Sequence, residues 1–149
     1  MSILSTFMKE DHRACDNKFA NMENAIADDN WTEGSKLFEN FGGDLLHHFD
    51  IEEDVMFPGF EARSENAHCN PTPVMIMEHS QMRQLVDSMR EAVTSKDKDK
   101  FFGLSETLMM TMQQHNMKEE QMMYPMIDEA MAEESNILLD SMKELPRKN

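Results

Sequence analysis

The stretch His48-Phe-Asp-Ile-Glu-Glu-Asp-Val-Met-Phe-Pro58 recurs, altered, as His115-Asn-Met-Lys-Glu-Glu-Gln-Met-Met-Tyr-Pro125. Both copies have the pattern His-x-x-x-Glu-Glu-x-x-Met-aromatic-Pro, and they lie 67 residues apart. Residues i and i+4 share one face of an α-helix, so each copy places one imidazole beside one carboxylate. Each copy is therefore a candidate half of a metal site.

Helical periodicity extends over most of the chain on either side of these motifs. Glycine and proline are scarce, at five each, and they fall between long segments in which apolar residues recur at spacings of three and four. Helices are predicted at about 2–27, 31–57, 73–95 and 98–133, with a polar loop at 59–72 and a short extra helix at 135–145. Pro125 is expected to kink or interrupt the fourth helix. The predicted fold is all-α: an antiparallel up-down four-helix bundle with a short C-terminal helix, in one domain over residues 1–149.

The offset of 67 residues relates more than the two motifs. It places His12 over His79 and Met8 over Met75 without a gap. The chain therefore contains two pseudo-repeats of a helix pair, at about 5–58 and 72–125. Each repeat supplies one His from its first helix and one His-x-x-x-Glu from its second, and an antiparallel bundle of two such pairs has a pseudo-twofold axis. Six polar side chains are predicted to meet near this axis: His12, His48, Glu52, His79, His115 and Glu119.

These six side chains lie on the inward stripes of their helices, where a bundle core is normally apolar. A single inward His is more often a hydrogen-bonded core residue than a ligand, but here four recur at one depth together with two carboxylates. Burial of two unpaired glutamates would cost several kcal/mol each, so they require cationic partners. No Lys or Arg occupies the four inward stripes. A bound metal is the simplest partner, and all six residues are candidate ligands.

The phase of the helix separates these candidates from the titratable residues next to them. Glu53 and Glu120 stand five residues after their histidines, so Glu52 and Glu119 are preferred as ligands. Two further histidines lie off the stripes and are expected to face solvent: His47 and His68.

Three more residues are candidates for a role around the ligands. Asp11 and Glu78 each precede a candidate His, and they are either acceptors for an outer ring nitrogen or solvated carboxylates. Tyr124, which the offset pairs with Phe57, could hydrogen-bond near the metals. It stands five residues after Glu119, however, and α-helical phase places it off the ligand face.

The donor set indicates the kind of metal. Four imidazoles and two carboxylates, with no thiolate, suit a pair of first-row cations such as iron or manganese. A structural zinc site is coordinatively closed and usually combines Cys with His, so zinc fits less well. Cys15, one turn after His12, is expected to be a core residue.

The pattern His…His-x-x-x-Glu…His…His-x-x-x-Glu on a four-helix bundle resembles the hemerythrin-like, or HHE cation-binding, domain family over about residues 5–130. The resemblance implies a non-haem centre of two iron ions with two bridging carboxylates and an oxo or hydroxo bridge. It implies reaction with dioxygen, peroxide or nitric oxide, as in relatives that decompose peroxide or repair iron centres after nitrosative and oxidative stress. An electron donor or an iron-protein client would then be the partner. The alternative is a non-catalytic module that carries or senses oxygen, or donates iron.

Two positions differ from the oxygen carriers of that family. The carriers have a fifth His four residues before the third-helix ligand, where this chain has Met75. Their last carboxylate is an aspartate five residues after its His, whereas the duplication here points to Glu119 at plus four. With two imidazoles per metal, both metals keep open positions. Redox reaction or metal lability is therefore expected rather than stable oxygen carriage.

The charge balance excludes several classes of partner. The chain has 29 acidic against 14 basic residues and a net charge of −15, so it offers no basic surface for nucleic acid or anionic lipid. No apolar run approaches the ~20 residues that span a bilayer, and the N-terminal stretch lacks the apolar region of a signal peptide. We expect a cytoplasmic protein without a nucleic-acid or membrane partner.

Alanine at a candidate ligand should remove metal, whereas alanine at an unrelated histidine should not. His48→Ala and Glu119→Ala are each expected to lose metal, and His68→Ala is expected to keep it. Elemental analysis of protein purified from its native cytosol checks this, with about two metal ions per wild-type chain expected for a di-iron carboxylate bundle. Zinc alone, or clearly fewer ions, would contradict the prediction.

Overall fold

The computed structural model describes residues 2–63 and 70–148, and in this part of the chain helices occur without any strand. The four long helices are α1 (Ile3–Ala27), α2 (Trp31–Ile51), α4 (Thr72–Thr94) and α5 (Lys98–Lys118). The shorter segments are the π-helical turns η1 (Glu52–Met56) and η3 (Glu119–Met123), and the helices α3 (Phe57–Arg63), α6 (Tyr124–Ala130) and α7 (Ser135–Glu144). The all-α bundle with a short C-terminal helix is confirmed. None of the described helices is both long and apolar enough to cross a membrane.

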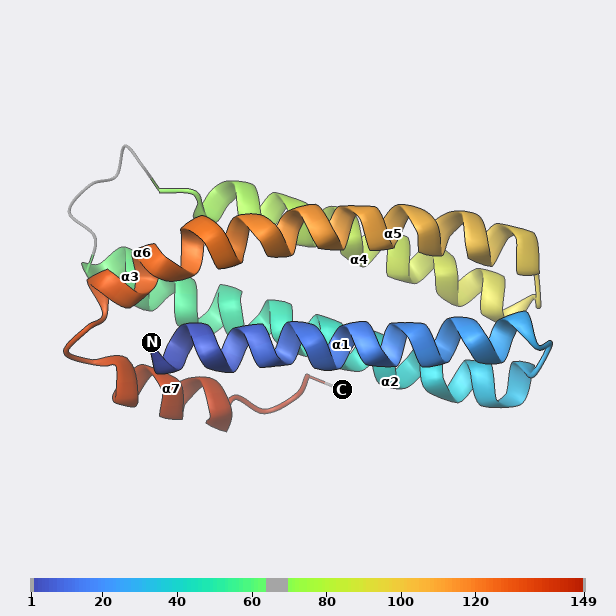
Figure 1. Cartoon of the computed structure of the whole chain (residues 1–149), viewed down its shortest axis with the longest axis horizontal. Helices are drawn as coiled ribbons and strands as arrows, with labels where there is room; N and C mark the ends of the chain where they lie inside the picture. The colour runs from blue at the N-terminus through green and yellow to red at the C-terminus, as the bar shows by residue number, and fades with distance from the viewer. Residues whose placement is uncertain (1, 64–69, 149) are drawn as a thin grey trace.

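Two helical hairpins make the bundle. Helices α1 and α2 form one, α4 and α5 form the other, and the hairpins pack through α2 against α4 and α1 against α5 (Figure 1). The tight turns obey the 67-residue offset: Asp29 and Lys96 have positive φ values of 60° and 55°. The side chains that cap the following helices, Asn30 and Asp97, are related by the same offset. The duplication therefore extends to the connections.

The core is divided into two apolar clusters. The first lies towards the two tight turns and includes Phe19, Phe41 and Val86. The second lies at the other end, where α3, α6 and α7 close the bundle, and includes Leu4 and Ile127. The layer between the two clusters is polar and contains the predicted ligands, so the fold places this layer in the middle of the bundle, away from either end.

The second and fourth predicted helices end at other residues than expected. Residues 59–63 belong to α3 and not to a loop, whereas 64–69 lie outside the described residues. The fourth helix ends at Ala130 and not at residue 133. Pro125 occupies the first turn of α6, where a missing N–H is tolerated, and Pro58 has the equivalent place at the start of α3. The interruption expected at Pro125 takes the form of the π-helical turn η3 before it.

Two glycines should respond to alanine in opposite ways. A Cβ at Gly34 would lie 2.7 Å from Cγ1 of the buried Ile26, whereas a Cβ at Gly103 would meet nothing within 4 Å. Gly34→Ala is expected to lower the free energy of unfolding by about 1–3 kcal/mol through overpacking. Gly103→Ala is expected to raise it by about 1 kcal/mol through helix propensity. Urea denaturation measures both, and a destabilising Gly103→Ala would contradict this assignment.

Candidate metal centre

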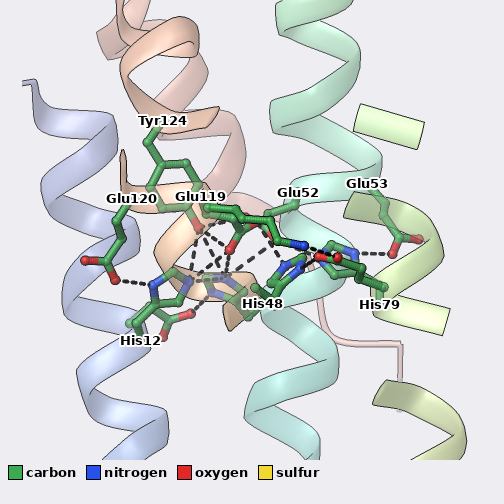
Figure 2. Close-up of polar contacts among 12 residues, drawn as sticks. His12, His48, Glu52, Glu53, His79, Glu119, Glu120 and Tyr124 are labelled. Atoms are coloured by element: carbon green, nitrogen blue, oxygen red, sulfur yellow. Dashed lines mark hydrogen bonds and ion pairs between the residues drawn. The ribbon is translucent and has the colours of Figure 1, made fainter. Parts of the chain in front are cut away.

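The six predicted ligands lie together in the polar layer (Figure 2). The four long helices supply the histidines, and the glutamates stand at the first positions of η1 and η3. All six residues are buried, with exposed fractions of 5% or less. By element, they are His12 on α1, His48 on α2, His79 on α4, His115 on α5, Glu52 on η1 and Glu119 on η3.

The donor atoms form two groups that share one glutamate. His79, His115 and both glutamates each offer an atom within 4.8 Å of the others, and His12 and His48 do the same with Glu119. In the first group, His79 Nε2 lies 2.9 Å from Glu52 Oε1. In the second, His12 Nε2 lies 3.1 Å from His48 Nε2 and 3.1 Å from Glu119 Oε1. The arrangement offers two adjacent metal positions, which we call the His12–His48 half and the His79–His115 half.

A carboxylate binds the outer ring nitrogen of every one of these histidines. Asp11 lies 2.6 Å from His48 Nδ1, and Glu78 lies 2.7 Å from His115 Nδ1. A carboxylate can only accept, so each Nδ1–H donates and Nε2 directs its lone pair towards the centre. These contacts fix the ring orientation and tautomer that a metal ligand needs. The sequence left Asp11 and Glu78 either as acceptors for a ring nitrogen or as solvated carboxylates. In the structure each accepts from the histidine of the neighbouring helix.

The other two histidines use carboxylates that sequence reasoning missed in this role. Glu120 lies 2.7 Å from His12 Nδ1, and Glu53 lies 2.6 Å from His79 Nδ1 (Figure 2). Both follow a candidate ligand directly in the motif and point to the opposite hairpin. The available signal was the doubled glutamate in both motif copies, because the second glutamate recurs together with the first.

Tyr124 lies inside the centre and makes the hydrogen bonds that the sequence left open, so only its α-helical phase, which put it off the ligand face, was wrong. The η3 turn is π-helical, and the Tyr124 N–H bonds to the carbonyl of Glu119, five residues earlier. In such a turn residues i and i+5 share a face. The Tyr124 hydroxyl donates to Glu52 at 2.7 Å and lies 3.2 Å from His12 Nε2. Its counterpart Phe57 stacks beside His79, so the shared aromatic position of the motif was the available signal.

Several buried oxygen and nitrogen atoms of the candidate ligands have no hydrogen-bond partner among the described residues. They are Glu52 Oε1, Glu119 Oε2, His79 Nε2 and His115 Nε2. Glu52 Oε1 and His79 Nε2 are close but not aligned for a hydrogen bond. Such atoms are costly to bury unless a cation receives their lone pairs.

The spacing in the His12–His48 half also fits a metal ion. Their Nε2 atoms, 3.1 Å apart, both carry lone pairs when each Nδ1–H donates outward. Two nitrogens at about 2.1 Å from one first-row cation, at right angles, lie about 3 Å apart. The residues present therefore fit a pair of metal ions.

Without metal, protons balance the charge of the two glutamates. Burial alone would lower the pKa of His48, but the charge of Glu52, the hydrogen bond with Asp11 and the nearby Glu119 carboxylate raise it well above its ordinary value. Burial likewise opposes, but the Glu119 carboxylate, whose Oε2 lies 3.3 Å from His115 Nε2, raises the pKa of His115 to about 9. Burial would raise the pKa of Glu119, but the adjacent Glu52 carboxyl and the His115 imidazole hold it well below its usual range. Imidazolium groups thus stand where cations would bind.

The remaining candidates lie apart from the centre. His47 is partly buried and not fully solvent-facing, and it belongs to neither donor group. His68 lies outside the described residues. Burial, with the charge of Asp11, raises the pKa of the Cys15 thiol to about 12, so Cys15 offers no thiolate and belongs to the core as expected.

Comparison with protein families identifies the class. The model of the hemerythrin HHE cation binding domain matches residues 4–127. The chain therefore belongs to the hemerythrin HHE cation-binding domain family, whose domains bind metal cations. Searches of curated proteins and of solved structures give no match.

Metal binding should release protons near neutral pH. A ligand histidine must be neutral, whereas His115, with a pKa of about 9, is protonated in the metal-free protein. Apparent metal affinity should therefore rise with pH until about pH 9. Calorimetry in buffers of different ionisation enthalpy measures the released protons. A heat of metal binding that is the same in every buffer would contradict the prediction.

The same pKa shift determines the stability of the metal-free protein. The His115 pKa is raised above its ordinary value of 6.5, so its contribution is fully present below 6.5 and is lost as pH rises through about 9. The metal-free protein should therefore unfold at a lower urea concentration at about pH 10 than at about pH 6. His115→Gln should reduce this difference but not abolish it, because the pKa values of His48 and His79 are raised as well.

Proposed function

We propose that the chain holds two iron ions and uses them to react with dioxygen, peroxide or nitric oxide in the cytoplasm. The observation that carries this proposal is the set of buried, inward-directed donor atoms without hydrogen-bond partners among the described residues. Every candidate histidine directs Nε2 inward because a carboxylate holds its Nδ1.

Each half would take two imidazoles from one hairpin and a glutamate from the other. His12 and His48 would hold one ion together with Glu119. The other ion would be held by His79, His115 and Glu52, with Glu119 shared between the two. Imidazole and carboxylate donors without thiolate favour iron over zinc, and manganese accepts the same donors. When bound, a pair of iron ions supplies one-electron redox chemistry and open positions for a small ligand.

Among residues 2–63 and 70–148, one hydroxyl reaches the centre. Tyr124, the one tyrosine of the sequence, is fully buried and places its hydroxyl 3.0 Å from Glu119 and 2.7 Å from Glu52. A phenol at this position donates a hydrogen bond to a carboxylate or to a small polar ligand that takes its place. On the opposite side Phe57 offers no donor, so Phe57 only excludes water there.

Reaction is favoured over oxygen carriage by the residue at position 75. Met75 is 1% exposed and packs in the apolar cluster, so it supplies no fifth imidazole to the centre. Fewer imidazoles leave more positions for exchangeable ligands. Repair of damaged iron centres under nitrosative or oxidative stress is one form of such chemistry, with an electron donor or an iron-protein client as partner.

Anaerobic loading with ferrous iron, followed by separate additions of peroxide alone and of nitric oxide or oxygen with excess ascorbate as the electron source, tests this function. At least one reagent should be consumed beyond the amount of bound iron. Tyr124→Phe should keep both ions, because Phe57 fills the equivalent place, and it should react about tenfold more slowly through loss of a hydrogen-bond donor. Electrode measurements of consumption and elemental analysis provide the two readouts.

Two outcomes would contradict the proposed reaction. No turnover with any of the three reagents would indicate a non-catalytic module that senses oxygen or donates iron. A long-lived oxygenated spectrum after exposure of the reduced protein to air would indicate an oxygen carrier.

Loss of iron in Tyr124→Phe would show that the hydroxyl serves metal retention and not the reaction.

A further inference from the structure

The surroundings of the two halves differ although their ligands match. In the His79–His115 half, Arg83 lies 2.8 Å from Glu53, and Lys118 pairs with Glu78. In the His12–His48 half, the corresponding carboxylates Glu120 and Asp11 have no Lys or Arg partner among residues 2–63 and 70–148. Glu120 and Asp11 are each 33% exposed, against 20% for Glu53 and 14% for Glu78.

The outer side of His79 is covered. The Phe49 ring stacks on the His79 ring at 4.1 Å between centroids and an interplanar angle of 16°. The Arg83 guanidinium lies over the Phe49 ring at 5.4 Å, while its two nitrogens contact Glu53 and Asp50. A stacked ring beneath a fixed guanidinium leaves no room for a small molecule to approach His79 from this side.

The same cover is missing beside His12. The 67-residue offset places Asn116 at the position of Phe49, Asp16 at that of Arg83 and Gln113 at that of Leu46. All three replacements line a pocket of about 500 Å³ between α1 and α5. His12 and Glu120 also line it, so the pocket adjoins this pair. Figure 2 shows the His12–Glu120 pair at one edge of the centre.

We propose that this pocket is the entry port through which an aquated divalent cation reaches the His12–His48 half. The proposal rests on the proposed function, since it requires a metal at that half. His12 is the most exposed of the six candidate ligands, at 5%. The lining carries two carboxylates, Asp16 and Glu120, against one base, Arg13. Amide and carboxylate oxygens accept hydrogen bonds from the water shell of a cation, whereas the phenylalanine of the other half cannot.

Because of the port, the two halves differ in how readily a bound cation exchanges with solvent. A cation in the His12–His48 half lies one side chain from the pocket, whereas a cation in the other half lies behind Phe49 and Arg83. Tyr124 stands in the His12–His48 half as well. Entry from solvent and the single hydroxyl of the centre are therefore on one side, and the His79–His115 half retains its ion.

Installing the residues of the covered half should close the port. Asn116→Phe and Asp16→Arg, alone and together, copy Phe49 and Arg83 into the open side. Anaerobic Co²⁺ uptake, followed by stopped-flow absorption, should become about tenfold slower in each single variant, as loss of electrostatic and steric access predicts. The final amount bound should stay at about two ions per chain, measured by elemental analysis.

Matched controls carry the same chemical changes outside the pocket. Gln114→Phe adds the same ring at an exposed position of α5, and Glu10→Arg adds the same two units of charge at an exposed position of α1. Both should load Co²⁺ at the wild-type rate. Urea denaturation of every variant shows whether it is folded, and Asp16→Arg, at an exposed position, tests the port even where Asn116→Phe disturbs packing.

The outcomes separate this route from the proposed function. Wild-type uptake of two ions with unchanged rates in the Asn116 and Asp16 variants would overturn the port and leave the metal centre intact. Equal slowing in the Gln114 and Glu10 controls would also overturn it, because general charge or bulk would then be the cause. Failure of the wild-type chain to bind two ions would overturn the proposed function and the port together.

Discussion

Two buried glutamates set the constraint on which this bundle depends. Glu52 and Glu119 are fully enclosed between apolar clusters, where an unpaired carboxylate costs several kcal/mol. No Lys or Arg pairs with either in the described part of the chain, so the positive charge must come from protonated imidazoles or from metal ions. A fold with such a layer at its centre is specified by what it binds as much as by its apolar contacts.

The same constraint fastens the two hairpins to each other. Each half of the centre takes its imidazoles from one hairpin and a glutamate from the other. The outer contacts cross as well, since Glu120 holds His12 and Glu53 holds His79. A metal ion bound here would link the two hairpins, in addition to the apolar packing on either side. Metal binding would then stabilise the association of the hairpins.

The sequence predicted the fold class and the six converging residues because both depend on α-helical periodicity and on one repeated offset. His12 and His79 have no local motif of their own, and the offset of 67 residues was needed to find them. The wrong phase given to Tyr124 has a clear physical origin. An α-helical phase places residue i+5 well away from residue i, so Tyr124 was placed off the face, and the π-helical turn restores it. Helix propensity does not predict a π turn, which depends on its surroundings in the fold.

The pair of Phe57 and Tyr124 also bears on how such a centre can arise. A symmetric homodimer of identical helical hairpins would place four imidazoles and two carboxylates around a true twofold axis. In that assembly every substitution occurs twice, so a hydroxyl on one side would always be matched on the other. Joining two copies in one chain removes this restriction. The aromatic position could then become a phenol in one copy and stay a hydrocarbon in the other, which breaks the symmetry of the site without altering any ligand.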